Sequence, residues 1–332
     1  MRRNRPASAL ALTLLLAAGM PHGARAQDAT QRFVTEDGEA PTDGRLRPVL
    51  PAPSRFGAPE ADSAYGAFQR GLFLTARNLA LPRAEDGDAA AQTLLGEIYS
   101  RGLGVATDFD EALKWYRKAA EQDVPEAQLQ VALALLRDDP DSVEGRELME
   151  AAADAGHGKA MFNHAQILLT DRPGTSGQRD AFDYFRGAAE AGIADAQFAV
   201  AQYYQQGTPP VFYDDTEARK WLQRAARQGF DSAQYELALY YLEGVGGERD
   251  FDQGFLWMAR AAHAGNVGAQ AELAKLLWSG IGIEPDDTQA AAWYVVARRA
   301  GLRDPVLEDF WLGLSAETQQ EAISRANGLQ RR

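Results

Sequence analysis

Apolar and small residues recur along this chain with a helical spacing, and the spacing itself recurs with a longer period. In AQTLLGEIYSRG, residues 91–102, such side chains stand at Ala91, Leu95, Ile98 and Tyr99, which is the pattern of one face of an α-helix. Equivalent segments begin near residues 91, 127, 160, 196, 233 and 269, at intervals of 36, 33, 36, 37 and 36 residues. A fixed period of this size is typical of a solenoid of stacked helical hairpins.

A glycine pair follows the first predicted helix in several of these units. The pairs are Gly102 with Gly104, Gly244 with Gly246, and Gly280 with Gly282. Glycine ends a helix readily and lets the backbone take a positive φ as the chain reverses. The pairs therefore predict the turn between the two helices of a hairpin.

The second predicted helix opens with a capping pattern in five of the six units. An aspartate precedes Glu or Gln by three residues, as in Asp108/Glu111, Asp141/Glu144, Asp214/Glu217, Asp250/Gln253 and Asp286/Gln289. We expect the aspartate to accept a hydrogen bond from a free helix amide, and the later residue to reach back to the cap amide.

A bulky residue stands seven positions after the cap. The residues are Trp115, Leu148, Trp221, Trp257 and Trp293, with Tyr184 in the third unit. Small residues lie three or four positions away, so the large side chain is expected to fill space where helices cross closely. An Ala-Ala pair then closes the helix, a glycine two residues later caps it, and the next unit begins.

The predicted array has flanking segments at both ends. A solenoid over residues 59–305 opens with an incomplete unit at 60–90, in which Ala76–Gly87 forms a second helix that Pro82 kinks or delays. Closing helices are expected over 306–332, with Ser315 as a cap. Residues 27–58 are rich in proline and lack a sustained apolar period, which is typical of a disordered leader.

The segments LLGEIYSRGLGVATDFDEALKWYRKAAEQ and LALYYLEGVGGERDFDQGFLWMARAAHAG resemble the Sel-one-like repeat, a relative of the tetratricopeptide repeat with a longer inter-helix loop. The resemblance covers roughly residues 87–303. It implies an all-α, right-handed α/α superhelical solenoid. The second and third units depart from the pattern, because both lack the glycine pair and carry Leu148 or Tyr184 in place of tryptophan.

The N-terminus has the pattern of a secretory signal peptide. Residues 1–26, MRRNRPASALALTLLLAAGMPHGARA, combine early arginines, a short apolar run and small residues, which predicts cleavage before Gln27. No later segment is apolar enough to predict a membrane span. We expect secretion, with the periplasm favoured and an extracellular location as the alternative.

Charge and cysteine content narrow the classes of partner. Cleavage removes four arginines and no acid, leaving 30 basic and 47 acidic side chains and a net charge of 30 − 47 = −17. Such a balance repels nucleic acid and anionic lipid, and it serves either solubility or a cationic partner. The chain has no cysteine, which excludes disulfides, a lipoprotein anchor and cysteine-ligated metal.

No cluster of residues predicts catalysis, a metal or a cofactor. His157, His164 and His263 fall in different repeats, and His164 stands at the core position held by Leu95 and Leu237. We therefore expect a buried structural histidine.

Two further patterns have structural explanations. The sequence GVGGE at 244–248 follows no predicted strand, so it is a hairpin turn rather than a phosphate loop. The acid pairs Asp214-Asp215 and Asp286-Asp287 stand at helix starts, where capping explains them. Some Sel-one-like proteins bind or hydrolyse β-lactams, but those are rich in cysteine.

A polar stripe runs along the first helices, opposite the apolar face. We call it the first-helix stripe, and its candidate partner-binding residues are Glu97, Arg101, Arg137, Gln166, Gln202, Gln206, Glu236, Leu239, Glu243, Glu272 and Lys275. In tetratricopeptide-like stacks the first helices line the concave face, so the resemblance implies a groove. A merely solvated face is the alternative. Tyr240 and Trp278 are either anchors in that groove or core residues.

The favoured function is a non-catalytic scaffold or adaptor that binds a protein or peptide on the concave face. By the resemblance, it regulates envelope signalling or exopolysaccharide production. The alternatives are a hydrolase acting on β-lactam or cell-wall material, and a structural component of envelope assembly.

Overall fold

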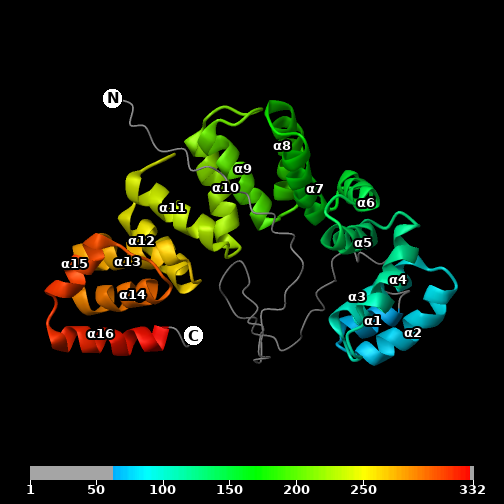
Figure 1. Cartoon of the computed structure of the whole chain (residues 1–332), viewed down its shortest axis with the longest axis horizontal. Coiled ribbons are helices and arrows are strands. Elements are labelled where there is room, and N and C mark those ends of the chain that lie inside the picture. Colours follow the sequence, from blue (N-terminus) through cyan, green and yellow to red (C-terminus); the bar gives the residue numbers. More distant parts are fainter. Residues whose placement is uncertain (1–62, 330–332) are drawn as a thin grey trace, which may run out of the picture. The chain divides into compact units, whose positions relative to one another are not determined.

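A computed structural model of the chain describes residues 63–329, and these residues form helices without any strand (Figure 1). The helices are α1 Ser63–Gln69, α2 Phe73–Glu85, α3 Ala89–Arg101, α4 Phe109–Ala120, α5 Pro125–Asp138, α6 Val143–Asp154, α7 Gly158–Asp171, α8 Thr175–Glu190, α9 Ala194–Gln206, α10 Asp215–Arg227, α11 Asp231–Glu243, α12 Phe251–His263, α13 Val267–Ser279, α14 Asp287–Arg299, α15 Pro305–Gly313 and α16 Ala316–Leu329. The predicted signal peptide (1–26) and leader (27–58) lie outside the described residues.

Consecutive helices pack side by side from α1 to α5 and from α7 to α14, which confirms the all-α solenoid of helical hairpins. The chain divides into two compact units, one ending at Ala152 and the other beginning at Ala153. Among residues 63–329 no helix is both long and apolar enough to cross a bilayer.

The first unit has a core between α2, α3 and α4. Leu94, Leu95 and Ile98 on α3 are buried, and Trp115 of α4 packs in the same cluster. A second cluster forms around Tyr116 on the other side of α4, where α5 begins. The apolar face predicted for residues 91–102 is therefore the buried face.

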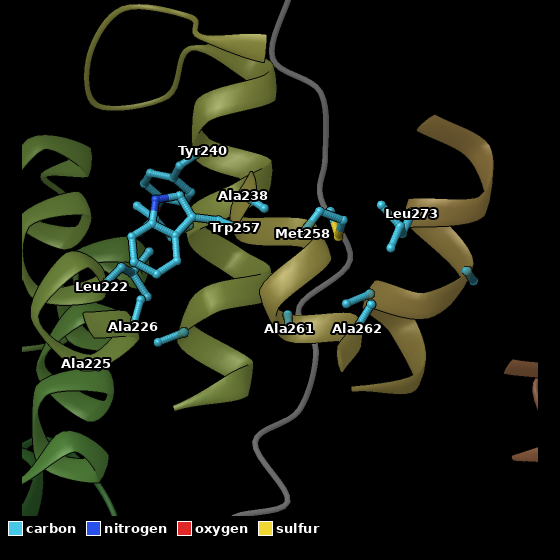
Figure 2. Packing of buried hydrophobic residues seen from close by; sticks show 14 of the residues in the cluster. Leu222, Ala225, Ala226, Ala238, Tyr240, Trp257, Met258, Ala261, Ala262 and Leu273 are labelled. Atoms are coloured by element: carbon cyan, nitrogen blue, oxygen red, sulfur yellow. The ribbon is translucent and has the colours of Figure 1, made fainter. Parts of the chain in front are cut away.

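The second unit has one continuous core from α7 to α16. Figure 2 shows its repeating element: Trp257 points from α12 toward Leu222 on α10, while Met258 points toward Leu273 on α13. The Ala-Ala pairs are almost fully buried, as in Ala261 (0% exposed) and Ala262 (1%). Because alanine is small, the second helix of each hairpin can approach its neighbours closely.

The tryptophans are core residues, as the sequence predicts. Trp115, Trp221, Trp257 and Trp293 are 6%, 8%, 7% and 2% exposed. In the first three, a cation three residues later lies over the ring, with Lys118, Arg224 and Arg260 at 4.4, 4.3 and 4.6 Å from the ring centroid. The long side chain covers the outer face of the indole and keeps its charge in water.

The aspartates cap the second helices as predicted, but the Glu or Gln three residues later does not play its predicted part. Asp108, Asp214, Asp250 and Asp286 accept hydrogen bonds from the amides three residues later, at 2.8–3.1 Å. The cap amides do not rely on the Glu or Gln side chains, because they donate to first-helix carbonyls: Asp108 to Tyr99, Asp214 to Tyr204, Asp250 to Tyr241 and Asp286 to Leu277. Each hairpin loop is thus closed by a backbone hydrogen bond.

Helix α6, the second helix of the second repeat, is capped differently from the prediction. Helix α6 begins at Val143, and Ser142 Oγ accepts from the amide of Gly145 at 3.2 Å. Asp141 instead forms an ion pair with Arg146 at 2.8 Å. The assignment of Asp141 as the cap is wrong, because Ser142 stands one residue closer to the helix and supplies the same acceptor.

The glycine turns are confirmed. Gly244 and Gly246 have φ of 74° and 65°, and a Cβ at Gly246 would stand 2.2 Å from the carbonyl oxygen of Asp215. The glycines after the Ala-Ala pairs also have positive φ, as at Gly229 (89°) and Gly265 (101°). In the first unit Asp123 takes this conformation at φ 57° without glycine.

The N-terminal end of the array differs from the sequence prediction, and the C-terminal end agrees with it. The leading segment has two helices, α1 and α2, and α2 runs through Pro82 to Glu85, although Pro82 has no N–H to donate to the preceding turn. At the other end α15 and α16 close the array, with Ser315 Oγ accepting from the amide of Thr318 at 3.1 Å. Helix α16 packs on α14 and buries Ala322 and Ala326.

A glutamine at the start of the first helix ties successive hairpins together. The Nε2 atoms of Gln92, Gln197, Gln234 and Gln270 donate to the carbonyls of Ala84, Ala189, Ala226 and Ala262, at 3.0, 3.0, 3.1 and 3.3 Å. These carbonyls belong to the last turn of the preceding second helix, and each also accepts a backbone hydrogen bond from the glycine that follows that helix. The glutamine is therefore a cross-hairpin cap.

The side-chain oxygen of this glutamine, Oε1, has a hydrogen-bond donor in only some of the repeats. Gln122 and Gln228 each donate Nε2 to the Oε1 of Gln92 and Gln197, at 2.8 Å. The residues equivalent to Gln228 are Ala264 and Ala300, which cannot donate, and within residues 63–329 Gln234 and Gln270 have no partner for Oε1.

Ala264→Gln is therefore expected to stabilise the protein by about 1 kcal/mol, the usual net contribution of a buried hydrogen bond. Ala264 (φ −72°, ψ −8°) and Gln228 (φ −83°, ψ 0°) are both helix C-cap residues with similar backbone conformations, so the new side chain leaves the backbone in the same direction as that of Gln228. Chemical denaturation measures the effect.

Ala191→Gln is the matched control. Ala191 is the C-cap of α8 with φ −71° and ψ −2°, but its hairpin carries Met161 where the others carry glutamine. A gain of similar size at both positions would show that the glutamine acts through helix propensity rather than through Gln234.

Candidate functional site

The first helices of the second unit are joined to one another by side-chain hydrogen bonds and an ion pair. Gln205 of α9 donates Nε2 to Glu236 of α11 at 2.8 Å. Asn266, the cap of α13, donates Nδ2 to Asp231 of α11 at 3.1 Å. Lys275 of α13 forms an ion pair with Asp304, the cap of α15, at 2.7 Å. Helices α9, α11, α13 and α15 are thus laterally connected, and Glu236 and Lys275 are the stripe residues that take part.

Glu236 is a half-buried carboxylate in this surface. Burial raises the pKa of its carboxyl, and the hydrogen bond from Gln205 opposes that shift. Within residues 63–329 Glu236 forms no ion pair, and its carboxylate is stabilised by the hydrogen bond from the Gln205 amide.

Lys275 is held between two acids. It lies 3.0 Å from Glu272 on its own helix and 2.7 Å from Asp304. Burial lowers the pKa of Lys275, but the hydrogen bonds to Asp304 and Glu272 outweigh burial and leave the pKa raised. The hydrogen bond from Lys275 lowers the pKa of Asp304, against burial and together with the amides of Leu307 and Val306. Lys275 and Asp304 are therefore ionised at neutral pH, and the two contacts hold the Lys275 ammonium in place.

Two tyrosines lie beneath the stripe and serve the core. Tyr240 is 7% exposed and donates its hydroxyl to Asp215 at 3.0 Å, while Tyr203 is 8% exposed and donates to the carbonyl of Gln178 at 3.1 Å. Burial raises the pKa of Tyr203 to about 12. Tyr240 is therefore a core residue rather than an anchor in the groove.

Trp278 differs from these tyrosines, because 40% of its surface is exposed. Its ring lies against Phe310 of α15, with the ring centroids 4.8 Å apart. It is the more accessible of the two aromatic residues that the sequence placed near the stripe.

The remaining stripe residues of the second unit differ in accessibility. Gln206 and Glu243 are exposed, Gln202 is half-buried, and Leu239 is half-buried against the core. Gln166 is only 8% exposed, so it presents little surface to a partner. Helical spacing gave the direction of Gln166 but not the depth at which α7 lies.

In the first unit the stripe residues are already paired locally. Arg101 forms an ion pair with Glu97 at 2.7 Å, and Arg137 pairs with Asp138 at 2.9 Å. Both arginines are exposed, so these pairs contribute little to stability and can be exchanged for a partner's charges.

The histidines have structural environments. His164 is 6% exposed, as predicted, and its ring meets the edge of Tyr184 with centroids 4.7 Å apart. His157 caps α7 by accepting from the amide of Ala160 at 3.3 Å, and His263 lies edge-on to Trp293 at 4.8 Å. Over residues 63–329 no three acidic or histidine side chains come together as a metal site.

Stacked hairpins with glycine turns, buried tryptophans and a polar first-helix surface define the class of helical-repeat proteins. Within that class, the Sel1 repeat model matches six consecutive segments, 89–124, 125–157, 158–193, 194–230, 231–266 and 267–302. Because these segments cover more than half of the chain, the protein belongs to the Sel1 repeat family. This confirms the resemblance stated from the sequence. Sel1 repeats are protein-interaction modules.

Solved structures of relatives have the same fold. A Sel1 repeat protein from Oxalobacter formigenes is 26% identical, covers 73% of this chain and 98% of its own, and superposes with a TM-score of 0.60. A protective antigen with an SLR fold from uropathogenic Escherichia coli is 25% identical, with a TM-score of 0.52, over 78% of this chain and 64% of that chain.

A curated relative is similar over a shorter stretch. An uncharacterised protein of Neisseria meningitidis serogroup B is 30% identical over 167 residues, which is 49% of this chain and 34% of the relative. The chain thus spans about a third of the length of that relative.

Glu236→Gln is expected to stabilise the protein at neutral pH, because it keeps the acceptor for Gln205 and removes a half-buried charge. The pKa of Glu236 is raised in the folded state, so the wild-type protein loses stability as pH rises from the ordinary carboxyl pKa through the raised one. The gain should vanish in acid, where Glu236 is protonated in both states. Urea unfolding across this pH range measures the difference.

Glu243→Gln provides the control, because Glu243 is an exposed glutamate on the same helix. An equal, pH-dependent gain in this variant, or a constant gain for Glu236→Gln at every pH, would contradict the explanation.

Proposed function

We propose that this protein is an exported, non-catalytic scaffold that binds a protein or peptide partner along the first-helix stripe. Sel1 repeat proteins are generally non-catalytic scaffolds, which supports a binding role for the chain as a whole. The observation that carries the proposal is the set of lateral contacts Gln205–Glu236, Asn266–Asp231 and Lys275–Asp304.

These contacts favour binding because they fix the stripe before a partner arrives. A surface made of separate helices loses conformational entropy when a ligand orders it. Here each first helix from α9 to α15 is held to the next one, so less ordering remains to be done on binding.

The chemistry of the stripe indicates the kind of partner. In the second unit its charged members are Glu236, Glu243, Glu272 and Lys275, and Lys275 is already neutralised by Glu272 and Asp304. Gln206 and Glu243 are both exposed, at the C-terminal ends of α9 and α11. A basic or hydrogen-bonding segment fits this surface better than an acidic one.

Glu243→Lys is expected to weaken partner binding by at least roughly tenfold, because it places a like charge opposite a basic segment. Crosslinking in the intact envelope, followed by mass spectrometry, identifies the partner, and titration with that purified partner measures the change in affinity. Asp252→Lys makes the same charge change at an exposed position on the second helix α12 and should leave binding unchanged. Equal affinities for both variants would exclude the stripe as the binding surface.

Export is the second part of the proposal. When residues 1–332 are expressed in a Gram-negative host, the protein should be recovered from the periplasm with Gln27 at its N-terminus. N-terminal sequencing and fractionation measure this, and a chain lacking residues 1–26 should stay in the cytoplasm. Recovery of the full chain from the cytoplasm, with Met1 retained, would refute it.

A regulatory role in envelope signalling or exopolysaccharide production rests on the family resemblance alone. A hydrolase would instead turn over nitrocefin or peptidoglycan fragments as the purified mature protein. A structural component of envelope assembly would associate tightly with itself and with few other ligands.

A further inference from the structure

The second helices α10 and α12 carry basic residues without acidic neighbours in their C-terminal parts. Residues 218–230 and 253–266 contain Arg219, Lys220, Arg224, Arg227 and Arg260 but no aspartate or glutamate. The whole chain has 34 basic and 47 acidic side chains, so these two stretches run against its composition. Positive charge is therefore concentrated on α10 and α12.

The helix dipole alone does not explain this concentration. Cations are favoured near the C-terminal end of any helix. The last turns of α6 and α8, which are second helices of the same array, nevertheless hold no basic residue, and these helices end at Asp154 and Glu190. The repeat accepts acids at this end of a second helix, so the fold does not require the arginines of α10 and α12.

Arg224 and Arg260 occupy equivalent positions in consecutive hairpins, three residues after a tryptophan. Their guanidinium carbons lie 4.3 Å from the ring centroid of Trp221 and 4.6 Å from that of Trp257. Both arginines are exposed, whereas both tryptophans are buried. The indole therefore holds each guanidinium group at the surface, where its N–H donors reach water.

These guanidinium groups have no carboxylate partner within the chain. Among residues 63–329 Arg224, Arg227 and Arg260 form no ion pair, whereas the nearby Lys220 pairs with Glu217 at 2.6 Å. Arg227 stands three residues after Arg224, so it lies on the same face of α10, and it is also exposed. Three exposed cations on the second helices of adjacent hairpins thus lack a counter-charge.

A partner that carries carboxylates fits this surface better than a nucleic acid or a membrane. Guanidinium groups bind carboxylate or phosphate through paired N–H donors. Single-stranded nucleic acid also needs exposed aromatic rings for stacking, but the Trp221 and Trp257 rings are buried beneath the arginines. A helix that binds a membrane surface needs an exposed apolar face, and no large apolar side chain of α10 is exposed.

We propose that the outer face of α10 and α12 binds an acidic protein segment, whose aspartate or glutamate carboxylates pair with Arg224, Arg227 and Arg260. We call this surface the arginine face. Charge complementarity selects the partner, and the net negative charge of the chain does not prevent binding, because salt screens charges more than about 10 Å away. The arginine face lies on second helices, so this inference adds a binding surface of opposite sign and does not depend on the function proposed for the first-helix stripe.

The experiment titrates the full chain into a dye-labelled octaglutamate peptide in about 0.1 M salt, with binding measured by fluorescence anisotropy. The peptide should bind saturably. The double variant Arg224→Gln/Arg260→Gln should bind it roughly tenfold more weakly, because two charge pairs are lost. No saturable binding to the wild-type chain, or undiminished binding to the double variant, would overturn the proposal.

Lys118→Gln is the matched control. Lys118 lies 4.4 Å from the ring centroid of Trp115 in the same way, but Glu121 and Asp123 follow it in the chain. This variant should leave octaglutamate binding unchanged. A loss as large as that of the double variant would show that uncovering a tryptophan or lowering the total charge weakens binding, and it would refute the arginine face.

Arg227→Gln removes a charge without uncovering a ring, because among the described residues Arg227 makes no cation–π contact. It should weaken octaglutamate binding roughly threefold. An unchanged affinity would contradict a surface built from the three arginines.

Two further probes identify the class of ligand. A dye-labelled octathymidylate and vesicles of phosphatidylglycerol present phosphates instead of carboxylates, and both should bind more weakly than octaglutamate. Tighter binding of either probe, lost in the double variant, would assign the arginine face to nucleic acid or to lipid and would refute the acidic protein segment.

Discussion

The fold depends on close packing at the joint between one hairpin and the next. A two-helix unit cannot bury its apolar face alone, so each unit must lean on its neighbour. Alanine pairs such as Ala225-Ala226 and Ala261-Ala262 are at most 1% exposed at this joint, and they let the helix backbones approach closely. The large tryptophans, which stand four residues before these alanines on the same helix face, then fill the space that the small side chains leave.

At this joint the backbone carbonyls that end one second helix already accept from a glycine amide, and the glutamine of the next first helix supplies a second donor. The bonds from Gln197 to Ala189 and from Gln234 to Ala226 repeat this solution in adjacent hairpins. The glutamine brings a second polar atom into the joint, however. Whether that atom is satisfied depends on one residue, the C-cap of the following helix, which is Gln228 in one hairpin and Ala264 in the next. Repeats with the same backbone thus differ in their polar chemistry.

Much of this could be predicted from the sequence, because glycine turns and tryptophan positions follow from spacing and conformational preference. Sequence spacing does not predict how deeply a helix is buried or which residues from different hairpins meet. The pattern placed Gln166 on a surface stripe, but α7 lies deep enough to bury it. It assigned the cap of α6 to Asp141, although Ser142 stands closer to the helix. Cross-hairpin bonds such as Gln205 to Glu236 join residues 31 positions apart, and no local pattern announces them.

The fold restricts the residues at the joint tightly and those of the stripe only loosely. This difference helps to separate structural residues from functional ones. At the joint, size and hydrogen bonding leave few acceptable residues, so the repeat looks the same from unit to unit. On the stripe the fold requires only a polar, solvated side chain. The half-buried charge of Glu236 exceeds that requirement, because holding a charge away from water brings a desolvation cost that a freely solvated surface avoids. This cost supports the binding role proposed for the stripe better than a role in solubility alone.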